Sequence, residues 1–214
     1  MPCNPKGYRI VVLGDGGVGK TSLTMGLCGH EFSQTYDPTI EDSFKTEIEI
    51  DHIQYPLHVL DTAGQEEYVN LLDGWISQGD GIVLVYDVTS RASFASLRHL
   101  IKQAMRVKWD LEDSAASSPS SLPIMIVGNK TDMVDARVVR ATEGLALAKA
   151  YGCEFTETSA KCMKNVTKAF RDVVKILLPL SSHSSDDAPF FGSLAGAILS
   201  PWTKLLDGGC CAVM

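Results

Sequence analysis

The chain has 214 residues, of which 45% are hydrophobic and 21% are charged, a composition typical of a folded globular protein and not of a disordered or collagen-like one. Its formal charge of −7 argues against nucleic-acid binding through a basic surface. The six cysteines have no Cys-x-x-Cys spacing, which argues against a disulfide framework or a zinc site and favours a protein of a reducing compartment. The sequence shows no apolar signal segment and no apolar run long enough to span a membrane, so we expect neither secretion nor a membrane span.

Short apolar segments rich in β-branched residues alternate with longer segments of helical period. We predict strands at Tyr8–Leu13, Ile82–Asp87 and Ile124–Gly128, each followed by a helix, which is the pattern of βαβ units. The alternating stretch over 44–50, followed by 53–60, predicts an antiparallel hairpin. Pro56 should cause a bulge or an unpaired position in its second strand. The expected fold is α/β, with a mixed sheet that has one antiparallel edge strand.

The second half of the chain predicts more helices and two irregular segments. Helices are expected at 93–107, 142–151 and 164–178. Pro179 should end the last helix. The serine-rich stretch 110–122 indicates an exposed loop, and the sequence loses its periodicity beyond Pro179. We expect one domain over residues 1–178, with an insertion at 110–122, followed by a flexible tail over 179–214.

A glycine-rich segment lies directly between the first predicted strand and the first predicted helix. It matches the pattern G-x-x-x-x-G-K-S/T with Gly14, Asp15, Gly16, Gly17, Val18, Gly19, Lys20 and Thr21. Its glycines let backbone N–H groups point at a phosphate, to which the helix N-terminus and Lys20 add positive charge. Thr21 would place its hydroxyl on Mg²⁺. The strand–loop–helix context favours a P-loop over a plain glycine-rich turn.

An acidic residue follows the apolar run that ends at Leu60. Asp61 stands where a Walker-B aspartate belongs and would hold Mg²⁺, while Gly64 could donate its N–H to a γ-phosphate and Gln65 could orient an attacking water. An Asp-x-x-Gly segment after a strand is, by itself, as often a simple turn.

Asn129, Lys130 and Asp132 follow the strand 124–128 at its carboxyl end, where ligands bind in open α/β sheets. The Asp132 carboxylate can accept from guanine N1–H and N2–H₂, whereas adenine has no donors there. The segment Ser159, Ala160 and Lys161 follows the strand-like stretch 153–156 and would offer a backbone N–H to guanine O6. A capping turn before the last helix is the alternative for this segment.

These four motifs, in this order between about Tyr8 and Leu178, resemble those of the Ras-family small GTPases, and of Ras more than of its relatives. The resemblance implies a P-loop G domain with a six-stranded, mostly parallel sheet and helices on both faces. It also implies Mg²⁺-dependent binding of GTP or GDP, slow GTP hydrolysis, and work as a membrane-attached switch in signal transduction. Its partners would be a GTPase-activating protein, a guanine-nucleotide exchange factor and effector proteins.

The resemblance also assigns roles to single residues. It implies that Thr39 supplies a second hydroxyl to Mg²⁺, that Phe32 packs against the guanine plane, and that residues 61–68 form switch II. Switch I and the effector region would comprise Tyr36, Asp37, Pro38, Thr39, Ile40, Glu41, Asp42, Ser43 and Phe44. The implied catalytic residues are Lys20, Thr39, Gly64 and Gln65, and the implied metal ligands are Thr21, Thr39 and Asp61. The implied nucleotide contacts are Gly14 to Ser22, Phe32, Tyr36, Pro38, Thr39, Asp61, Gly64, Asn129, Lys130, Asp132, Ser159, Ala160 and Lys161.

The sequence departs from the family pattern in a few places. Asp15 stands where Ras has a small apolar residue, although phosphate contact through the loop backbone should survive. Phe44 replaces a tyrosine, which could shift partner preference. The stretch 110–122 is longer than the Ras connection and should lie at the pole away from the nucleotide. Without the family, Phe32 would be interpreted as a core residue at a helix end.

The last four residues, Cys211 to Met214, form a C-a-a-X motif whose terminal Met favours farnesylation of Cys211. Cys210 is a candidate palmitoylation site. The uncharged stretch 188–203 is too short to span a bilayer, and both an interfacial segment and a disordered apolar tail remain open. The expected location is the cytoplasmic face of the plasma membrane, with endomembranes as the alternative.

Two other functions fit a P-loop. A P-loop kinase or ATPase is opposed by Asn129 and Asp132, which do not suit adenine. A scaffold that holds GTP without turnover is opposed by Gly64 and Gln65.

Overall fold

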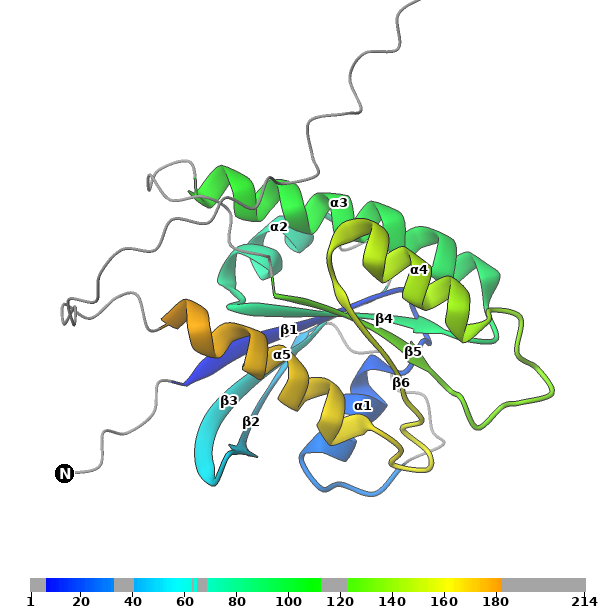
Figure 1. Ribbon diagram of the computed structural model, residues 1–214, viewed down its shortest axis with the longest axis horizontal. Coiled ribbons are helices and arrows are strands. Elements are labelled where there is room, and N and C mark those ends of the chain that lie inside the picture. Colours follow the sequence, from blue (N-terminus) through cyan, green and yellow to red (C-terminus); the bar gives the residue numbers. More distant parts are fainter. Residues whose placement is uncertain (1–6, 33–40, 63, 65–68, 113–122, 182–214) are drawn as a thin grey trace, which may run out of the picture. The chain divides into compact units, whose positions relative to one another are not determined.

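The computed structural model describes residues 7–32, 41–62, 64, 69–112 and 123–181. Figure 1 shows its strands and helices, which alternate along the chain after an initial hairpin. The strands are β1 (Tyr8–Leu13), β2 (Glu41–Ile50), β3 (Ile53–Thr62), β4 (Gly81–Asp87), β5 (Ile124–Asn129) and β6 (Glu154–Glu157). The helices are α1 (Lys20–Leu27), α2 (Val69–Gln78), α3 (Arg91–Glu112), α4 (Ala141–Tyr151) and α5 (Val166–Ser181).

The strands form one six-stranded sheet in the order β2-β3-β1-β4-β5-β6. β2 runs antiparallel to β3 at one edge, and every other neighbouring pair is parallel. The mixed sheet with one antiparallel edge strand, expected from the sequence, is therefore confirmed. The turn between β2 and β3 consists of Asp51 and His52, both with positive φ, as a two-residue type I′ turn requires.

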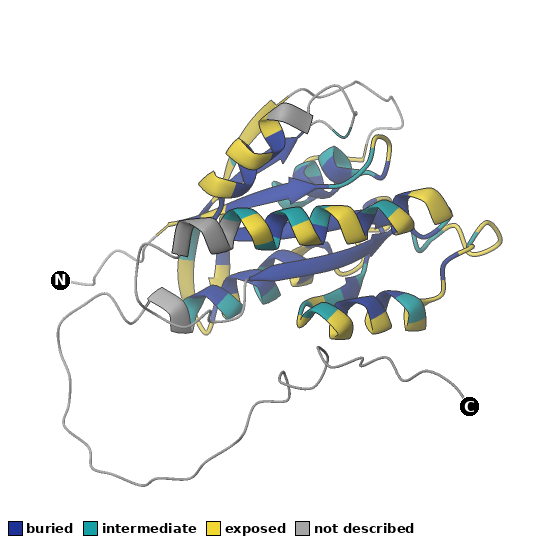
Figure 2. Cartoon of the chain, turned by 90° about the horizontal axis from the view of Figure 1, so that it is seen from above, coloured by how far each residue is buried: buried dark blue, intermediate teal, exposed yellow. Residues whose placement is uncertain are grey.

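Helices cover both faces of the sheet because the central strands bury side chains on both sides. Alternate residues of β1, β4 and β5 join two separate hydrophobic clusters, one with α1 and α5 and the other with α2, α3 and α4. Figure 2 shows these strands as a buried layer between helices whose outer faces are exposed. Burial on both faces explains why the central strands are continuous apolar runs in the sequence.

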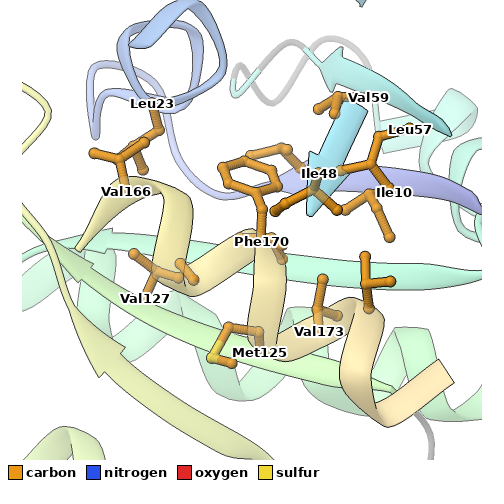
Figure 3. Close-up of a cluster of buried hydrophobic side chains, with 14 of the residues drawn as sticks. Ile10, Leu23, Ile48, Leu57, Val59, Met125, Val127, Val166, Phe170 and Val173 are labelled. Carbon is orange, nitrogen blue, oxygen red and sulfur yellow. The ribbon is translucent and has the colours of Figure 1, made fainter. Parts of the chain in front are cut away.

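Phe170 of α5 is a large, fully buried side chain of the first cluster. Its ring lies among Ile10 of β1, Ile48 of β2 and Leu23 of α1 (Figure 3). This packing fixes α1, and with it the segment that precedes α1, against the sheet. In the described part of the chain, none of the helices combines the length and the apolar composition that crossing a membrane requires.

The structure corrects the expectation for Pro56. The register between β2 and β3 continues without a bulge, with Pro56 opposite Glu47. On its other side β3 pairs with β1 only from Leu57 onward, opposite Tyr8. The missing N–H of Pro56 therefore lies next to a stretch without a second partner strand, where it need not interrupt the sheet.

Two helix ends also differ from the expectation. α5 continues past Pro179 to Ser181, so the expectation that this proline ends the helix is wrong. A proline in the last turn forfeits one backbone hydrogen bond, and the buried face of α5 holds the helix regardless. α3 extends to Glu112, so Asp110 to Glu112 are helical and not part of a loop. Residues 113–122 of the expected insertion lie outside the described residues.

Candidate functional site

The motifs singled out in the sequence follow the carboxyl ends of β1, β3, β5 and β6, which lie at one edge of the sheet. Hydrogen bonds between these loops confirm that they meet, as described below. Several implied site residues lie outside the described residues. These are Tyr36, Asp37, Pro38, Thr39, Ile40 and Gln65 in the two switch segments, and Cys210 and Cys211 in the tail.

The loop between β1 and α1 wraps around the side chain of Lys20. The Lys20 Nζ donates to the backbone carbonyls of Gly14 and Asp15, at 2.9 Å each. Burial lowers the pKa of Lys20 to about 8, although the nearby Asp61 and Asp15 carboxylates raise it in part. The ammonium group is therefore costly to keep charged where it stands, and an anion at this position would stabilise it.

Asp61 and Thr21 face each other beside this lysine. The Thr21 Oγ1 donates to Asp61 Oδ2 at 2.6 Å, and Asp61 is completely buried. Burial raises the pKa of Asp61 to about 6, against the opposing effects of Thr21 and Lys20. The other carboxylate oxygen, Oδ1, is buried and has no hydrogen-bond partner among the described residues. A buried oxygen left without a partner is rare in a folded protein and suits an additional ligand at this point.

This pair fits Mg²⁺ in its chemistry, because carboxylate and hydroxyl oxygens are ligands that this hard cation prefers. The described residues hold no cluster of three or more His, Cys, Asp or Glu side chains that would bind a metal by themselves. A cation here would consequently depend on other oxygen donors besides Asp61 and Thr21, and phosphate oxygens are such donors.

Gly64 lies against the P-loop. A Cβ on Gly64 would collide with the Lys20 Nζ and with the backbone carbonyl of Asp15. No residue with a side chain fits this position without displacing one of them. Gly64, which the sequence predicts near a γ-phosphate, lies against Lys20, the lysine that such a phosphate would contact.

Asn129, at the end of β5, connects the P-loop and the loop after β6 from a buried position with only 1% of its surface exposed. Its Nδ2 donates to the Val18 carbonyl of the P-loop at 2.9 Å. Its Oδ1 accepts from Thr158 Oγ1 at 3.1 Å and from the Ala160 N–H at 3.2 Å. A Cβ on Gly19, which has φ 94°, would lie 2.5 Å from Asn129 Nδ2, so this close approach also requires glycine.

Lys130 adds a second connection between β5 and the P-loop. Its Nζ donates to the Gly17 carbonyl at 2.8 Å and forms an ion pair with Asp87 Oδ2 at 2.7 Å. Asp87 is buried at the end of β4, and its Oδ1 accepts from Thr89 N and Oγ1 at 2.8 and 2.7 Å. Burial alone would raise the pKa of Asp87, but the hydrogen bonds from Lys130 and Thr89 outweigh burial and lower it.

Sequence reasoning did not identify Asp87 as a site residue. The available signal was its position, because it ends a buried strand at the same edge of the sheet as Asp61 and Asn129.

Asp132 lies beside the loop that follows β6. Its Oδ1 accepts from the buried Ser159 Oγ at 2.6 Å, and Ser159 Oγ in turn accepts from the Cys162 N–H at 3.1 Å. The expected association of these two segments is thus present. The Ala160 N–H already donates to Asn129, while the Lys161 side chain is exposed.

Phe32 follows α1 and is 41% exposed. The interpretation of Phe32 as a core residue, made from the sequence without the family, is therefore wrong. An exposed aromatic face is able to stack on a planar ligand.

Of the implied effector region, Glu41, Asp42 and Ser43 are exposed at the start of β2, and Phe44 packs in part against the first hydrophobic cluster. The carboxylate of Glu41 accepts from Trp75 Nε1 of α2 at 2.8 Å. Helix α2 was not predicted from the sequence, although the buried Leu72, Trp75 and Ile76 have the spacing of a helix face.

Comparisons with known proteins identify the family of the chain. The profile of the Ras family matches residues 9–178. The chain is 54% identical to Protein ras-2 of Neurospora crassa over 79% of each chain. It is 52% identical to Ras-like protein 1 of Pyricularia oryzae, over 79% of this chain and 74% of the relative, and 51% identical to Ras-like protein B of Aspergillus fumigatus, over 79% and 77%. The chain therefore belongs to the Ras family, whose members are small GTPases that bind GTP or GDP with Mg²⁺ and act as signalling switches.

Proposed function

We propose that the loops at the carboxyl edge of the sheet form the guanine-nucleotide site of this GTPase, with the residue roles inferred from the sequence. The observation that carries this proposal is the set of bonds from Asn129 and Lys130 to the P-loop and to the loop after β6. These bonds bring the candidate base-binding and phosphate-binding segments into one site.

Recognition of the base rests on Asp132. Its carboxylate accepts from guanine N1–H and N2–H₂, and Ser159 holds it in place from behind. Phe32 lies over one face of the base, with Lys130 and Lys161 alongside. Adenine would leave the carboxylate without a donor, so the site discriminates by about 10⁴ or more.

Binding of the phosphates uses the P-loop backbone, from Gly14 to Gly19, together with the N-terminus of α1, where Thr21 and Ser22 stand. The N–H groups of the loop and the helix dipole stabilise the negative charge. Lys20, which now donates to two carbonyls of its own loop, donates to the phosphates when nucleotide is bound. The residues that would hold Mg²⁺ are Thr21, Asp61 and, in switch I, Thr39. When bound, this cation neutralises charge on the phosphate oxygens.

Hydrolysis is proposed to rest on Gly64, whose N–H donates to the γ-phosphate, and on Gln65, which orients the attacking water. The sequence has no Arg or Lys between Thr21 and Phe44 that could stabilise the developing charge in cis. The intrinsic rate is therefore slow, and a GTPase-activating protein that supplies a cation accelerates it by about 10³ to 10⁵.

Residues 1–178 form the G domain of this proposal, and 179–214 form a tail that attaches it to the cytoplasmic face of a membrane. Farnesylation of Cys211 alone gives weak, reversible attachment, so a second signal is needed. Residues 180–214 carry three Asp and one Lys, a net charge of −2, which excludes attraction to anionic lipid as that signal. Palmitoylation of Cys210 or insertion of 188–203 supplies it.

Nucleotide competition tests the base site. Asp132→Asn should shift preference from guanine toward xanthine, because the amide N–H₂ donates to xanthine O2 where a carboxylate only accepts. The wild-type protein in the same assay, with ATP as an additional competitor, also tests the kinase or ATPase alternative. A variant that keeps full preference for GTP over XTP contradicts the placement of Asp132. Single-turnover hydrolysis by the wild type separates a GTPase from a scaffold that only holds GTP.

A further inference from the structure

Asp15 joins three parts of the site that are remote in the sequence. Its Oδ1 accepts from Ser96 Oγ of α3 at 2.8 Å. Its backbone carbonyl accepts from Lys20 Nζ at 2.9 Å, and Gly64 packs directly against the same carbonyl. Helix α3, the P-loop lysine and the glycine that follows β3 therefore all meet at this residue.

The carboxylate of Asp15 must be held in a fixed position, because its negative charge would repel bound phosphates in a partly buried site. Ser96 provides that position. Its hydroxyl lies 2.8 Å from the Asp15 carboxylate and 3.0 Å from the Ser93 carbonyl of its own helix. A hydroxyl bond to a carboxylate is stronger than one to a neutral carbonyl, so the single hydroxyl proton favours Asp15.

Ser96 stands on a rigid support. The adjacent Leu97, together with Phe94 and Ile101 of the same helix, is buried in the second hydrophobic cluster. Other side chains hold the second half of the P-loop, where Asn129 bonds the Val18 carbonyl. The Asp15–Ser96 bond connects the first half of the loop to α3 in the same manner.

We propose that Asp15 and Ser96 form a positioning pair that fixes the P-loop backbone where Lys20 and Gly64 meet. This inference rests on the function proposed above, in which Lys20 and Gly64 act at the γ-phosphate. Loss of the pair should consequently slow GTP hydrolysis more than it speeds the release of GDP, because GDP lacks the γ-phosphate and is held by the base site and the other phosphate contacts.

The experiment measures single-turnover GTP hydrolysis and the dissociation rate of fluorescent GDP on the full chain. Ser96→Ala and Asp15→Leu should each slow hydrolysis by about fivefold and change GDP dissociation by less than about twofold. Because both substitutions remove the same bond, the double variant should be no slower than either single variant. Ser96→Thr keeps a hydroxyl that can donate to Asp15, so its hydrolysis rate should stay within about twofold of the wild type.

Ser77→Ala is the matched control. The Ser77 hydroxyl of α2 donates to the carbonyl of Gly74, three residues earlier, which is the contact that Ser96 makes with Ser93. Its loss tests the effect of removing a helical serine hydroxyl and should leave both rates unchanged. Unchanged hydrolysis in Ser96→Ala, additive losses in the double variant, or equal changes of hydrolysis and GDP release would each overturn the proposal. A wild type that does not hydrolyse GTP would instead refute the proposed function.

Discussion

Replacement of Asn129 by alanine should destabilise the protein even when no nucleotide is present. The described contacts of this side chain are with the protein itself, to Val18, Thr158 and Ala160. Its first effect should therefore be on the architecture of the site, and the loss of nucleotide affinity should follow from that.

The structure allows the size of this effect to be worked out. Asn129→Ala removes three hydrogen bonds at a site with 1% exposure and leaves a carbonyl, a hydroxyl and an N–H without their partner. Each unsatisfied buried group costs about 1–3 kcal/mol, and water that enters the vacated space recovers part of this cost. We expect a loss of about 3 kcal/mol from a total that is typically about 5–15 kcal/mol. For a chain of this length that corresponds to a fall in Tm of about 10 °C.

Urea unfolding of nucleotide-free protein is the suitable assay, because bound GDP would add its own stabilisation. Asp132→Ala is the matched control. The described hydrogen bond of Asp132 is to Ser159 Oγ, on a half-buried side chain, so its removal should cost less than about 1 kcal/mol while GDP affinity falls. The reasoning is refuted if Asn129→Ala unfolds within about 1 kcal/mol of the wild type, or if Asp132→Ala is equally destabilised.

Three further predictions concern other parts of the molecule. A Cβ on Gly16 would lie 3.6 Å from the Gly64 carbonyl, so the valine of Gly16→Val should crowd this region. Hydrolysis stimulated by a GTPase-activating protein, measured by phosphate release, should be abolished, while GTP binding, measured by filter binding, should persist. The lowered pKa of Asp87 means that its charged form stabilises the fold above its ordinary pKa and that this contribution is lost as the pH falls through the lowered value. Asp87→Asn should therefore be less stable than the wild type at pH 7 in urea, and the difference should shrink below about pH 4. Cys211→Ser should move the protein to the soluble fraction of lysed cells, and wild-type membrane retention in this variant would contradict the lipid anchor.

The motifs could be located from the sequence because each follows a strand that the sequence also predicts. β4 and β5 are buried along their whole length, which makes them continuous apolar runs with clear ends. A polar residue at the end of such a run, such as Asn129 of β5, lies at the carboxyl edge of a parallel sheet almost by necessity. The fold class and the meeting of the motifs follow from this rule.

The residues that support the motifs could not be predicted in the same way. Ser96 and Asp15 are 81 positions apart, and Trp75 and Glu41 are 34 apart. No local pattern marks a serine on the side of α3 or an indole on α2 as a hydrogen-bond donor to a distant carboxylate. Such pairs become visible only when the packing of helix on sheet is known.

The two predictions based on prolines were wrong for a related reason. Local rules treat a proline as a break, but its cost is the loss of one backbone donor. Pro56 lies before the part of β3 that pairs with β1, and only two residues of α5 follow Pro179. In both places the surrounding packing outweighs a single missing hydrogen bond.

The bonds within the site are distributed unevenly, and this has a consequence for function. At the proposed base end, Asn129, Lys130 and Asp132 all have protein partners, so that this end is preformed in the described structure. At the phosphate end, Asp61 keeps a buried oxygen without a partner among the described residues, and Lys20 carries a pKa lowered to about 8 by burial. A ligand that brings negative phosphates and a cation would satisfy both groups. The energy of nucleotide binding is therefore expected to act mainly on the phosphate end of the site, where switch II begins at Asp61, as a switch requires.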